Sequence, residues 1–495
     1  MTSLWLDTEP FADGDTFTPQ GMFDDVVVGA GLTGLTTALL LTRAGHRVAI
    51  VEARSLGAVT TGNTTGKVSL LQGTQLSSIL KNHSEAVARA YLDGNREGQA
   101  WLLHYCGERA VPVEIRDAYS YAGTTDGRTA ARDEFEACHR VGLDVSWQSH
   151  ADLPFDTFGA IRLTDQAQID PIQLLKAMAK DFRTRGGRLY EGVRVLDIDT
   201  GDPCLVKTDA GAVRATNVIL ATGTPILDRG LYFAKLTAKR SYALAFRVPA
   251  TIPQGMYLSV DEPTRSLRTA ARDGAELLLV GGNGHDVGRE PSPKSRVADL
   301  ISWTERHFPG AELTHSWSAQ DYVSHNAAPF VGKLPRGAGH VFVATGYGKW
   351  GMTNGVAAGL RLAAEILGGH MEWADTLGKR LTYPHGVLQG LQANAEVAVE
   401  MVRGWATSEV HRMSDADEHP AEGEGVVRGV GVQPVGICTV DGATHKVSAV
   451  CSHLKGIVTW NDAERSWDCP LHGSRYAADG ALLEGPATTG LNPAV

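Results

Sequence analysis

The sequence is poor in cysteine, in positive charge and in long hydrophobic runs. Its 495 residues include six cysteines, too few for a disulfide framework. Acidic residues outnumber basic ones by 56 to 46, for a formal net charge of -10, so a nucleic acid or an anionic membrane is not an expected partner. The longest hydrophobic run, VVVGAGLTGLTTALLL, is interrupted by glycine and too short for a membrane span. The start, MTSLWLDTEPFADGD, has no export signal, and we expect a cytoplasmic protein with a small-molecule partner.

The chain has room for two or three domains. Residues 24–29, 34–44 and 47–52 read as strand, helix and strand, which make one βαβ unit. Residues 242–282 alternate like an antiparallel sheet, and residues 340–367 return to strand, glycine turn and helix. We therefore expect a Rossmann-like α/β domain interrupted by a second domain built on an antiparallel sheet.

The C-terminal part of the chain has a different sequence pattern. The run RMSDADEHPAEGEG, residues 412–425, is charged and without apolar periodicity, which predicts a linker. Residues 426–495 consist of short β-rich runs and Gly/Pro turns, which predict a small all-β domain.

A glycine motif follows the first predicted strand. Gly29, Gly31 and Gly34 form G-x-G-x-x-G at the start of a predicted helix, and Glu52 ends the next strand. Glycines here allow a tight turn and close approach to a pyrophosphate, which binds at the helix N-terminus, while the acid binds ribose hydroxyls. The motif predicts a dinucleotide site. The later stretch GYGKWG has no second strand ending in an acid after it, so it is not expected to be a second such turn.

Three stretches resemble the D-amino-acid oxidase superfamily of FAD-dependent oxidoreductases, which includes glycine oxidases. They are DVVVGAGLTGLTTALLLTRAGHRVAIVEA, ILATGTP and VFVATGYGKWGMTNGVAAGLRLAAEIL, and the resemblance covers about residues 22–370. It implies non-covalent FAD, because the late glycine segment has no cysteine for flavin attachment. The cofactor-binding residues it implies are Gly29, Gly31, Gly34, Glu52, Thr222, Gly223, Gly348, Gly351, Met352 and Thr353.

The same resemblance implies how the chain is divided. Residues 1–411 form the oxidoreductase, with FAD-binding parts at about 22–70, 170–235 and 325–370 and a substrate domain at about 71–169 and 236–324. The linker and the all-β domain follow.

The predicted catalytic residues are Lys67, Arg268 and Trp350. Lys67 is the one cation of TTGNTTGKVS, a loop that covers the flavin in relatives, where lysine can stabilise reduced flavin or help activate oxygen; a solvated loop lysine is the alternative. Arg268 suits bidentate binding of a substrate carboxylate, although it could equally be a surface arginine. Trp350 belongs to the segment that wraps the flavin ring in relatives. Gln320 and Asp321 are weaker candidates.

Two cysteine and histidine pairs stand near the C-terminus. Cys451 and His453 are two residues apart, Cys469 and His472 are three apart, and fifteen residues separate the pairs. The alternatives are unrelated core residues, a structural zinc site and an iron-sulfur cluster. Zinc fingers usually take two cysteines from one loop and two histidines from the other, whereas a mixed pair on each loop suits a two-iron centre.

C-x-H-x15-C-x-x-H resembles the signature of Rieske domains, over about residues 426–495. The resemblance implies a 2Fe-2S cluster with Cys451, His453, Cys469 and His472 as metal ligands. Gly473, Ser474 and Tyr476 match respiratory Rieske proteins, where the two hydroxyls hydrogen-bond the cluster and raise its potential. Gly456 and Leu471 stand where those proteins have a disulfide.

The two resemblances together predict an FAD-dependent enzyme that oxidises a small amine or amino acid. Electrons would pass from flavin to the Rieske cluster and on to an external acceptor, or to oxygen. Two alternatives remain open at this point: electron flow from cluster to flavin for reductive or oxygenating chemistry on a natural product, and an electron-transfer or redox-sensing module. A Rieske oxygenase is disfavoured, because nothing in the sequence suggests a 2-His-1-carboxylate iron site.

Overall fold

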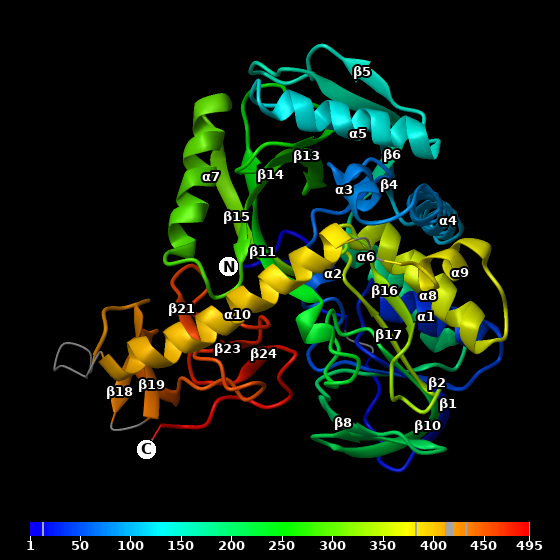
Figure 1. Cartoon of the computed structure of the whole chain (residues 1–495), viewed down its shortest axis with the longest axis vertical. Helices are drawn as coiled ribbons and strands as arrows, with labels where there is room; N and C mark the ends of the chain where they lie inside the picture. Colours follow the sequence, from blue (N-terminus) through cyan, green and yellow to red (C-terminus); the bar gives the residue numbers. More distant parts are fainter. Residues whose placement is uncertain (12–13, 382–383, 411–418, 431–432, 495) are drawn as a thin grey trace.

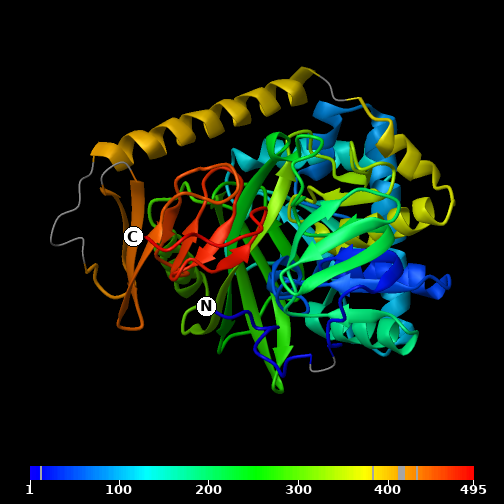
Figure 2. The same cartoon turned by 90° about the horizontal axis from the view of Figure 1, so that it is seen from below.

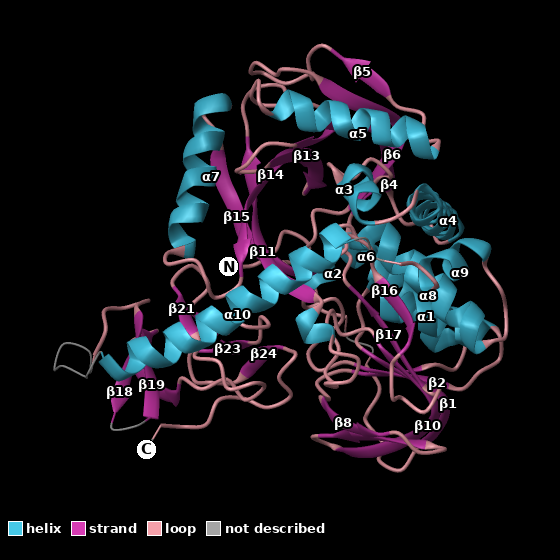
Figure 3. Ribbon diagram, in the orientation of Figure 1, coloured by secondary structure: helices cyan, strands magenta, loops and turns pink. Residues whose placement is uncertain are grey.

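The computed structural model describes residues 1–11, 14–381, 384–410, 419–430 and 433–494. Two large sheets and their helices make up residues 1–381, here called the large unit, and two small sheets lie in residues 419–494, here called the C-terminal domain (Figure 1). Figure 3 shows the helices lying against the sheets of the large unit. The helices are α1 (Leu32–Arg43), α2 (Thr60–Asn63), α3 (Gln75–Asn82), α4 (Glu85–Glu108), α5 (Gly127–Val141), α6 (Pro171–Thr184), α7 (Pro293–His307), α8 (Gly351–Ile366), α9 (Glu372–Gly378) and α10 (Pro384–Val410), with a 3-10 turn η1 (Tyr232–Ala234).

The first sheet is the dinucleotide-binding sheet that the sequence predicts. Its order is β16-β17-β10-β1-β2-β7; in addition, β9 pairs with β10, and β8 pairs with β9. The five strands β17, β10, β1, β2 and β7 are parallel. The strands are β1 (Met22–Val28), β2 (Val48–Val51), β7 (Arg188–Tyr190), β8 (Val195–Asp199), β9 (Cys204–Thr208), β10 (Gly211–Leu220), β16 (Phe330–Lys333) and β17 (Val341–Thr345). β1, α1 and β2 form the predicted βαβ unit, and the predicted α/β fold is confirmed.

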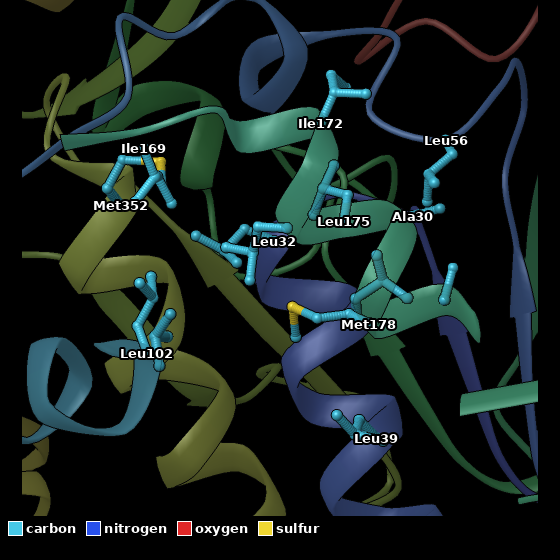
Figure 4. Close-up of a cluster of buried hydrophobic side chains, with 14 of the residues drawn as sticks. Ala30, Leu32, Leu39, Leu56, Leu102, Ile169, Ile172, Leu175, Met178 and Met352 are labelled. Atoms are coloured by element: carbon cyan, nitrogen blue, oxygen red, sulfur yellow. The ribbon is translucent and has the colours of Figure 1, made fainter. Parts of the chain in front are cut away.

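Helix α1 is buried on nearly every side, which explains its almost uninterrupted apolar and threonine sequence. It packs against α6 and α8, and its Leu32 and Leu39 lie in the hydrophobic cluster with Leu175 and Met178 of α6 (Figure 4). Each fully buried leucine contributes about 1.5–3 kcal/mol. Burial in this cluster therefore fixes the N-terminus of α1 at the end of the sheet.

The second sheet is antiparallel for the most part, as predicted. Its order is β15-β11-β14-β13-β12-β4-β6-β3, and β5 pairs with β6. The strands are β3 (Lys67–Val68), β4 (Val113–Tyr121), β5 (Ser146–Gln148), β6 (Ala160–Ile169), β11 (Leu236–Arg247), β12 (Met256–Ser259), β13 (Arg265–Arg272), β14 (Ala275–Asp286) and β15 (Glu312–Ser324). β3 belongs to this sheet although the sequence places residues 22–70 with the FAD-binding parts, because Lys67 pairs with Gln168.

The C-terminal domain is all-β, as predicted. One sheet contains β18 (Gly425–Val430), β19 (Gln433–Val440) and β20 (Ala443–Ser448), and the other contains β21 (Thr459–Asn461), β22 (Ser466–Asp468), β23 (Arg475–Ala477) and β24 (Leu482–Glu484). Its core, which includes Cys438, Trp467 and Tyr476, forms a hydrophobic cluster of its own. All six cysteines of the chain are free and buried.

Helix α10 spans both parts of the molecule (Figure 2). Asn394 donates a hydrogen bond to the Ala234 carbonyl of the large unit at 2.8 Å, whereas Val397 and Trp405 pack against the core of the C-terminal domain. The end of the predicted oxidoreductase, residues 1–411, thus contacts the domain that follows it. The first half of the predicted linker, residues 412–418, lies outside the described residues.

The C-terminal domain is docked directly on the large unit. Arg240 of β11 forms an ion pair with Glu464, and the Gln320 side chain donates to the Gly473 carbonyl at 2.8 Å. Two residues before Glu464, Asp462 accepts a hydrogen bond from the Ser292 hydroxyl at 2.9 Å. These contacts fix the position of the domain.

No helix within the described ranges is both long enough and apolar enough to span a membrane.

Candidate functional site

A cavity of about 490 Å³ lies where the two large sheets and the C-terminal domain meet. Its walls come from the glycine turn before α1, the end of β2, the loop around α2, strands of the second sheet, the start of α8 and residues 483–488 of the C-terminal domain. Among the residues predicted from the sequence, it is lined by Gly29, Gly31, Glu52, Lys67, Thr222, Gly223, Trp350, Gly351 and Met352. Residues from distant parts of the sequence are therefore brought to one cavity.

The glycine turn leaves space at the N-terminus of α1. A Cβ added to Gly31 would meet nothing closer than the Thr61 hydroxyl at 3.2 Å, so the space beside Gly31 is open to the cavity. A Cβ on Gly34 would lie 2.0 Å from the Gly29 carbonyl oxygen. Gly34 therefore allows the helix to pack against the turn, whereas Gly31 leaves room for a ligand at the helix N-terminus.

Glu52 closes the other side of the turn. Its carboxylate accepts hydrogen bonds from the backbone N–H groups of Ala30 and Arg54, each at 2.8 Å. Burial raises the pKa of Glu52, and these two hydrogen bonds oppose that effect. The acid is thus held beside the turn where a ribose hydroxyl is expected.

Four predicted residues are not part of the cavity lining: Gly34, Gly348, Thr353 and Arg268. Thr353 donates to Asn95 at 2.6 Å, on the side of α4. The Arg268 guanidinium is buried and donates to the backbone carbonyls of Thr65 and Thr269. This position does not support the substrate contact predicted for Arg268.

Lys67 reaches the cavity from β3. Its ammonium group donates to the Tyr257 carbonyl and to the Ser266 hydroxyl, both at 2.7 Å. Burial, and secondarily the charge of Arg268, lowers the pKa of Lys67 to about 7. Near neutral pH this side chain can therefore both donate and accept a proton.

Sequence reasoning missed several residues of the cavity. Lys349 lines it with a backbone φ of 75°, a left-handed value unusual for a side-chain-bearing residue. Asp321, a weaker candidate, accepts from the Lys349 backbone N–H, and burial raises its pKa to about 6. Tyr322 and Tyr347 also line the walls. The sequence signal for Lys349 was its place within GYGKWG, which identifies the turn and not the direction of its side chain.

The four predicted metal ligands form two pairs. The thiols of Cys451 and Cys469 lie together in the core of the C-terminal domain. The rings of His453 and His472 have centroids 5.3 Å apart, and His472 Nδ1 is buried with no hydrogen-bond partner among the described residues. Across the described part of the chain, no three His, Cys, Asp or Glu side chains are grouped as ligands of a single ion. A thiol pair beside an imidazole pair fits a two-iron centre, with His472 Nδ1 free to bind metal.

Of the two predicted hydroxyls, that of Tyr476 contacts a metal ligand. The Tyr476 hydroxyl lies 3.1 Å from the Cys451 sulfur, and the Ser474 hydroxyl accepts from the Ala487 N–H at 3.0 Å. A Cβ on Gly456 would lie 2.6 Å from the Leu471 side chain. The two ligand loops are therefore held together by apolar packing at the positions where respiratory Rieske proteins have a disulfide.

The residues present fit both predicted groups. The open space at Gly31 and the adjacent cavity suit FAD, and the orphaned imidazole nitrogen beside a thiol pair suits a Rieske cluster. This is the arrangement of a flavoprotein oxidoreductase joined to an iron-sulfur domain.

Comparison with known proteins identifies the family. Residues 24–365 match the family model "FAD dependent oxidoreductase", and residues 409–493 match "Rieske [2Fe-2S] domain". The chain belongs to the FAD-dependent oxidoreductases of the amino-acid oxidase type, and it carries a Rieske domain that binds a 2Fe-2S cluster. FAD and the cluster are its cofactors.

Individual relatives match between about three quarters and nearly all of the chain. A protein of Bacillus subtilis strain 168 described as a Rieske 2Fe-2S iron-sulfur protein, YhfW, is 31% identical over 94% of this chain and 92% of its own length. Gamma-glutamylputrescine oxidoreductase of Escherichia coli K12 is 26% identical over 76% of this chain and 90% of its own. The structure of glycine oxidase from Geobacillus kaustophilus, 18% identical, superimposes with a TM-score of 0.60 over 71% of this chain and 96% of its own.

The first prediction concerns the turn. Gly31→Val should reduce FAD occupancy to near zero in a protein that still folds, because the added side chain fills ligand space and meets no backbone. FAD released by denaturation measures occupancy. Gly107→Val, at a helix position where a Cβ meets nothing within 4 Å, is the control and should keep its FAD. Full FAD occupancy in Gly31→Val would refute the placement of the cofactor.

The second prediction concerns the cluster. Ser474→Ala and Tyr476→Phe should each lower its reduction potential, because a hydroxyl hydrogen bond stabilises the reduced, more negative cluster. A hydrogen bond of about 0.5–1.5 kcal/mol corresponds to about 20–65 mV in a one-electron couple. A redox titration followed by electron paramagnetic resonance (EPR) measures the shift. Potentials equal to the wild-type value in both variants would contradict this role.

Proposed function

We propose that this protein is a dehydrogenase for a small amine or amino acid that delivers electrons through its own Rieske cluster to an external acceptor. FAD, when bound, accepts two electrons from a substrate and can release them singly, and a Rieske cluster carries one. The observation that carries the proposal is a direct connection between the cavity wall and a cluster ligand loop.

That connection consists of two side chains of β15. Tyr322 lines the cavity, and Gln320 donates both to the Tyr322 hydroxyl at 3.0 Å and to the Gly473 carbonyl at 2.8 Å. Gly473 directly follows the metal ligand His472. The route from the cavity to the cluster site through these residues therefore consists of hydrogen bonds and covalent bonds, without a gap.

The two parts of the molecule also approach closely at this point. A Cβ on Gly473 would lie 2.5 Å from the Cβ of Ala238 on β11 and 2.9 Å from the Gln320 amide nitrogen. Gly473 has a φ of 79°, which favours glycine. A side chain here would push the ligand loop away from the large unit, so glycine supports a short route for electrons.

The charges of the cavity favour a zwitterionic substrate. Lys67 and Lys349 supply cationic groups, while Glu262 and Asp321 supply carboxylates. Relatives named as a glycine oxidase and a gamma-glutamylputrescine oxidoreductase act on amines or amino acids, as their names say. An amino acid would place its carboxylate near a lysine and its amino group near a carboxylate.

Lys67 is the residue we expect to handle a proton during the reaction. Its pKa of about 7 means that the ammonium form prevails below neutral pH and the amine form above it. The two hydrogen bonds to Tyr257 and Ser266 hold the nitrogen at a fixed place in the wall. Trp350, from the start of α8, lines the same cavity and shapes the substrate space.

The third prediction tests Lys67. Lys67→Met should leave FAD bound and slow flavin reduction or reoxidation at least severalfold, since general acid-base groups contribute about 10²–10⁴-fold when they take part in the chemistry. Stopped-flow absorbance of the two half-reactions gives the rates. The wild-type rates should show an inflection near pH 7 that is missing in the variant. Unchanged kinetics in both half-reactions would make Lys67 a structural residue.

The fourth prediction tests the electron path. Without oxygen, a substrate found in a panel of amines and amino acids should bleach the flavin and then produce the EPR signal of a reduced Rieske cluster. Gln320→Leu should slow cluster reduction severalfold and leave flavin bleaching unchanged, because it removes both hydrogen bonds of the route.

Ser292→Ala is the matched control for Gln320→Leu. It removes a hydrogen bond to Asp462 elsewhere in the same interface, so it should not slow cluster reduction. A flavin fully reduced by its substrate beside a cluster that stays oxidised would overturn the proposed direction of electron flow.

A further inference from the structure

The C-terminal domain supplies part of the cavity wall. Residues 483–488, here called the closing segment, contribute Leu483, Glu484, Gly485, Ala487 and Thr488 to the lining. The cavity is the one that contains the dinucleotide turn. A domain that follows the oxidoreductase in sequence thus completes the site in which FAD binds.

The closing segment lies toward the dinucleotide end of the cavity. Arg194 donates to the Leu482 carbonyl at 3.1 Å, and the charges of Arg194 and Glu52 act on each other. Gly485 sits beside Ile226, which lines the cavity together with the predicted cofactor residues Thr222 and Gly223. The segment is therefore near the turn and Glu52, where the pyrophosphate and ribose are expected.

Docking holds the closing segment in place. Glu484 pairs with Arg475 at 2.9 Å, and Arg475 pairs with Glu464 at 2.9 Å, which in turn pairs with Arg240 of the large unit. The Ala487 N–H donates to the Ser474 hydroxyl at 3.0 Å, so the segment is also tied to the cluster loop. If the domain moved away, the segment would move with it and open this side of the cavity.

We infer that the Rieske domain is also an FAD-retaining element: its closing segment forms the outer wall over the adenosine-diphosphate half of FAD and slows release of the cofactor. Docking and FAD binding then stabilise each other, because each favours the closed arrangement. This role concerns cofactor retention and is independent of the proposed substrate and direction of electron flow.

The direct test changes the side chains of the closing segment. FAD dissociation from the complete holoenzyme is followed by the recovery of flavin fluorescence after dilution. The double variant Leu483→Ala and Thr488→Ala should release FAD about tenfold faster, the effect of about 1.4 kcal/mol of lost contact. Thr489→Ala is the matched control, since Thr489 is exposed and does not line the cavity, and it should release FAD at the wild-type rate. An unchanged EPR spectrum shows that the cluster domain is intact.

A second variant acts on docking without touching the cavity. Glu464→Gln removes the charge between Arg240 and Arg475, and Glu464 is not among the cavity residues. This variant should likewise release FAD faster than the wild type. Bound FAD should also slow proteolytic removal of the C-terminal domain, and this protection should be larger in the wild type than in the variant. If the Glu464→Gln variant and the double variant both release FAD at the wild-type rate, the inference is overturned. If Glu464→Gln does not fold, the double variant alone decides it.

Discussion

The architecture depends on one buried ion-pair network between the two parts of the chain. Arg240 of β11 is fully buried and its guanidinium meets Glu464 of the C-terminal domain. Glu464 also pairs with Arg475, which contacts Asp468 at 3.1 Å. Burial by itself would raise the pKa of Glu464, but the charges of Arg240 and Arg475 outweigh it and lower that pKa. Loss of one partner from such a network typically costs about 3–5 kcal/mol, because a buried charge is left uncompensated.

A charge network of this kind selects one docking position. Sliding the C-terminal domain by a few ångströms would separate buried charges, whereas an apolar interface would tolerate small shifts. The second guanidinium nitrogen of Arg240 donates to the side-chain amide oxygen Oε1 of Gln320 at 2.7 Å, and this fixes the amide whose nitrogen reaches Gly473. The ion pair thus sets the geometry of the connection between the cavity and the cluster loop. It gives the domain a fixed place without relying on the linker.

Much of this molecule follows from local sequence patterns. The βαβ unit, the antiparallel sheet and the all-β C-terminal domain were predictable from such patterns. The fixed spacings of the glycine turn and of the Cys/His pairs predicted a dinucleotide site and favoured a two-iron centre, and the family resemblances then implied FAD and the Rieske cluster. Docking was not. Arg240 and Glu464 are 224 residues apart, and a lone arginine in a strand has no pattern that indicates its partner. The sequence likewise does not indicate the partner of Arg268. An arginine in a strand could bind a substrate carboxylate, but in the fold the Arg268 guanidinium binds backbone carbonyls outside the cavity lining.

Docking also affects the cluster loops themselves. The respiratory Rieske proteins that these loops resemble have a disulfide between them, but here Leu471 fills the space beside Gly456, a contact that is weaker than a covalent bond. Each loop has a further anchor on the large unit: His453 contacts Asp228 at 3.0 Å, and the Pro470 carbonyl accepts from Arg289 at 3.1 Å. Because the loops that carry the ligands are held partly by the large unit, the environment of the cluster depends on docking. The same interface therefore affects the environment of the cluster and closes the FAD cavity. It couples the two cofactor sites structurally, independently of electron transfer between them.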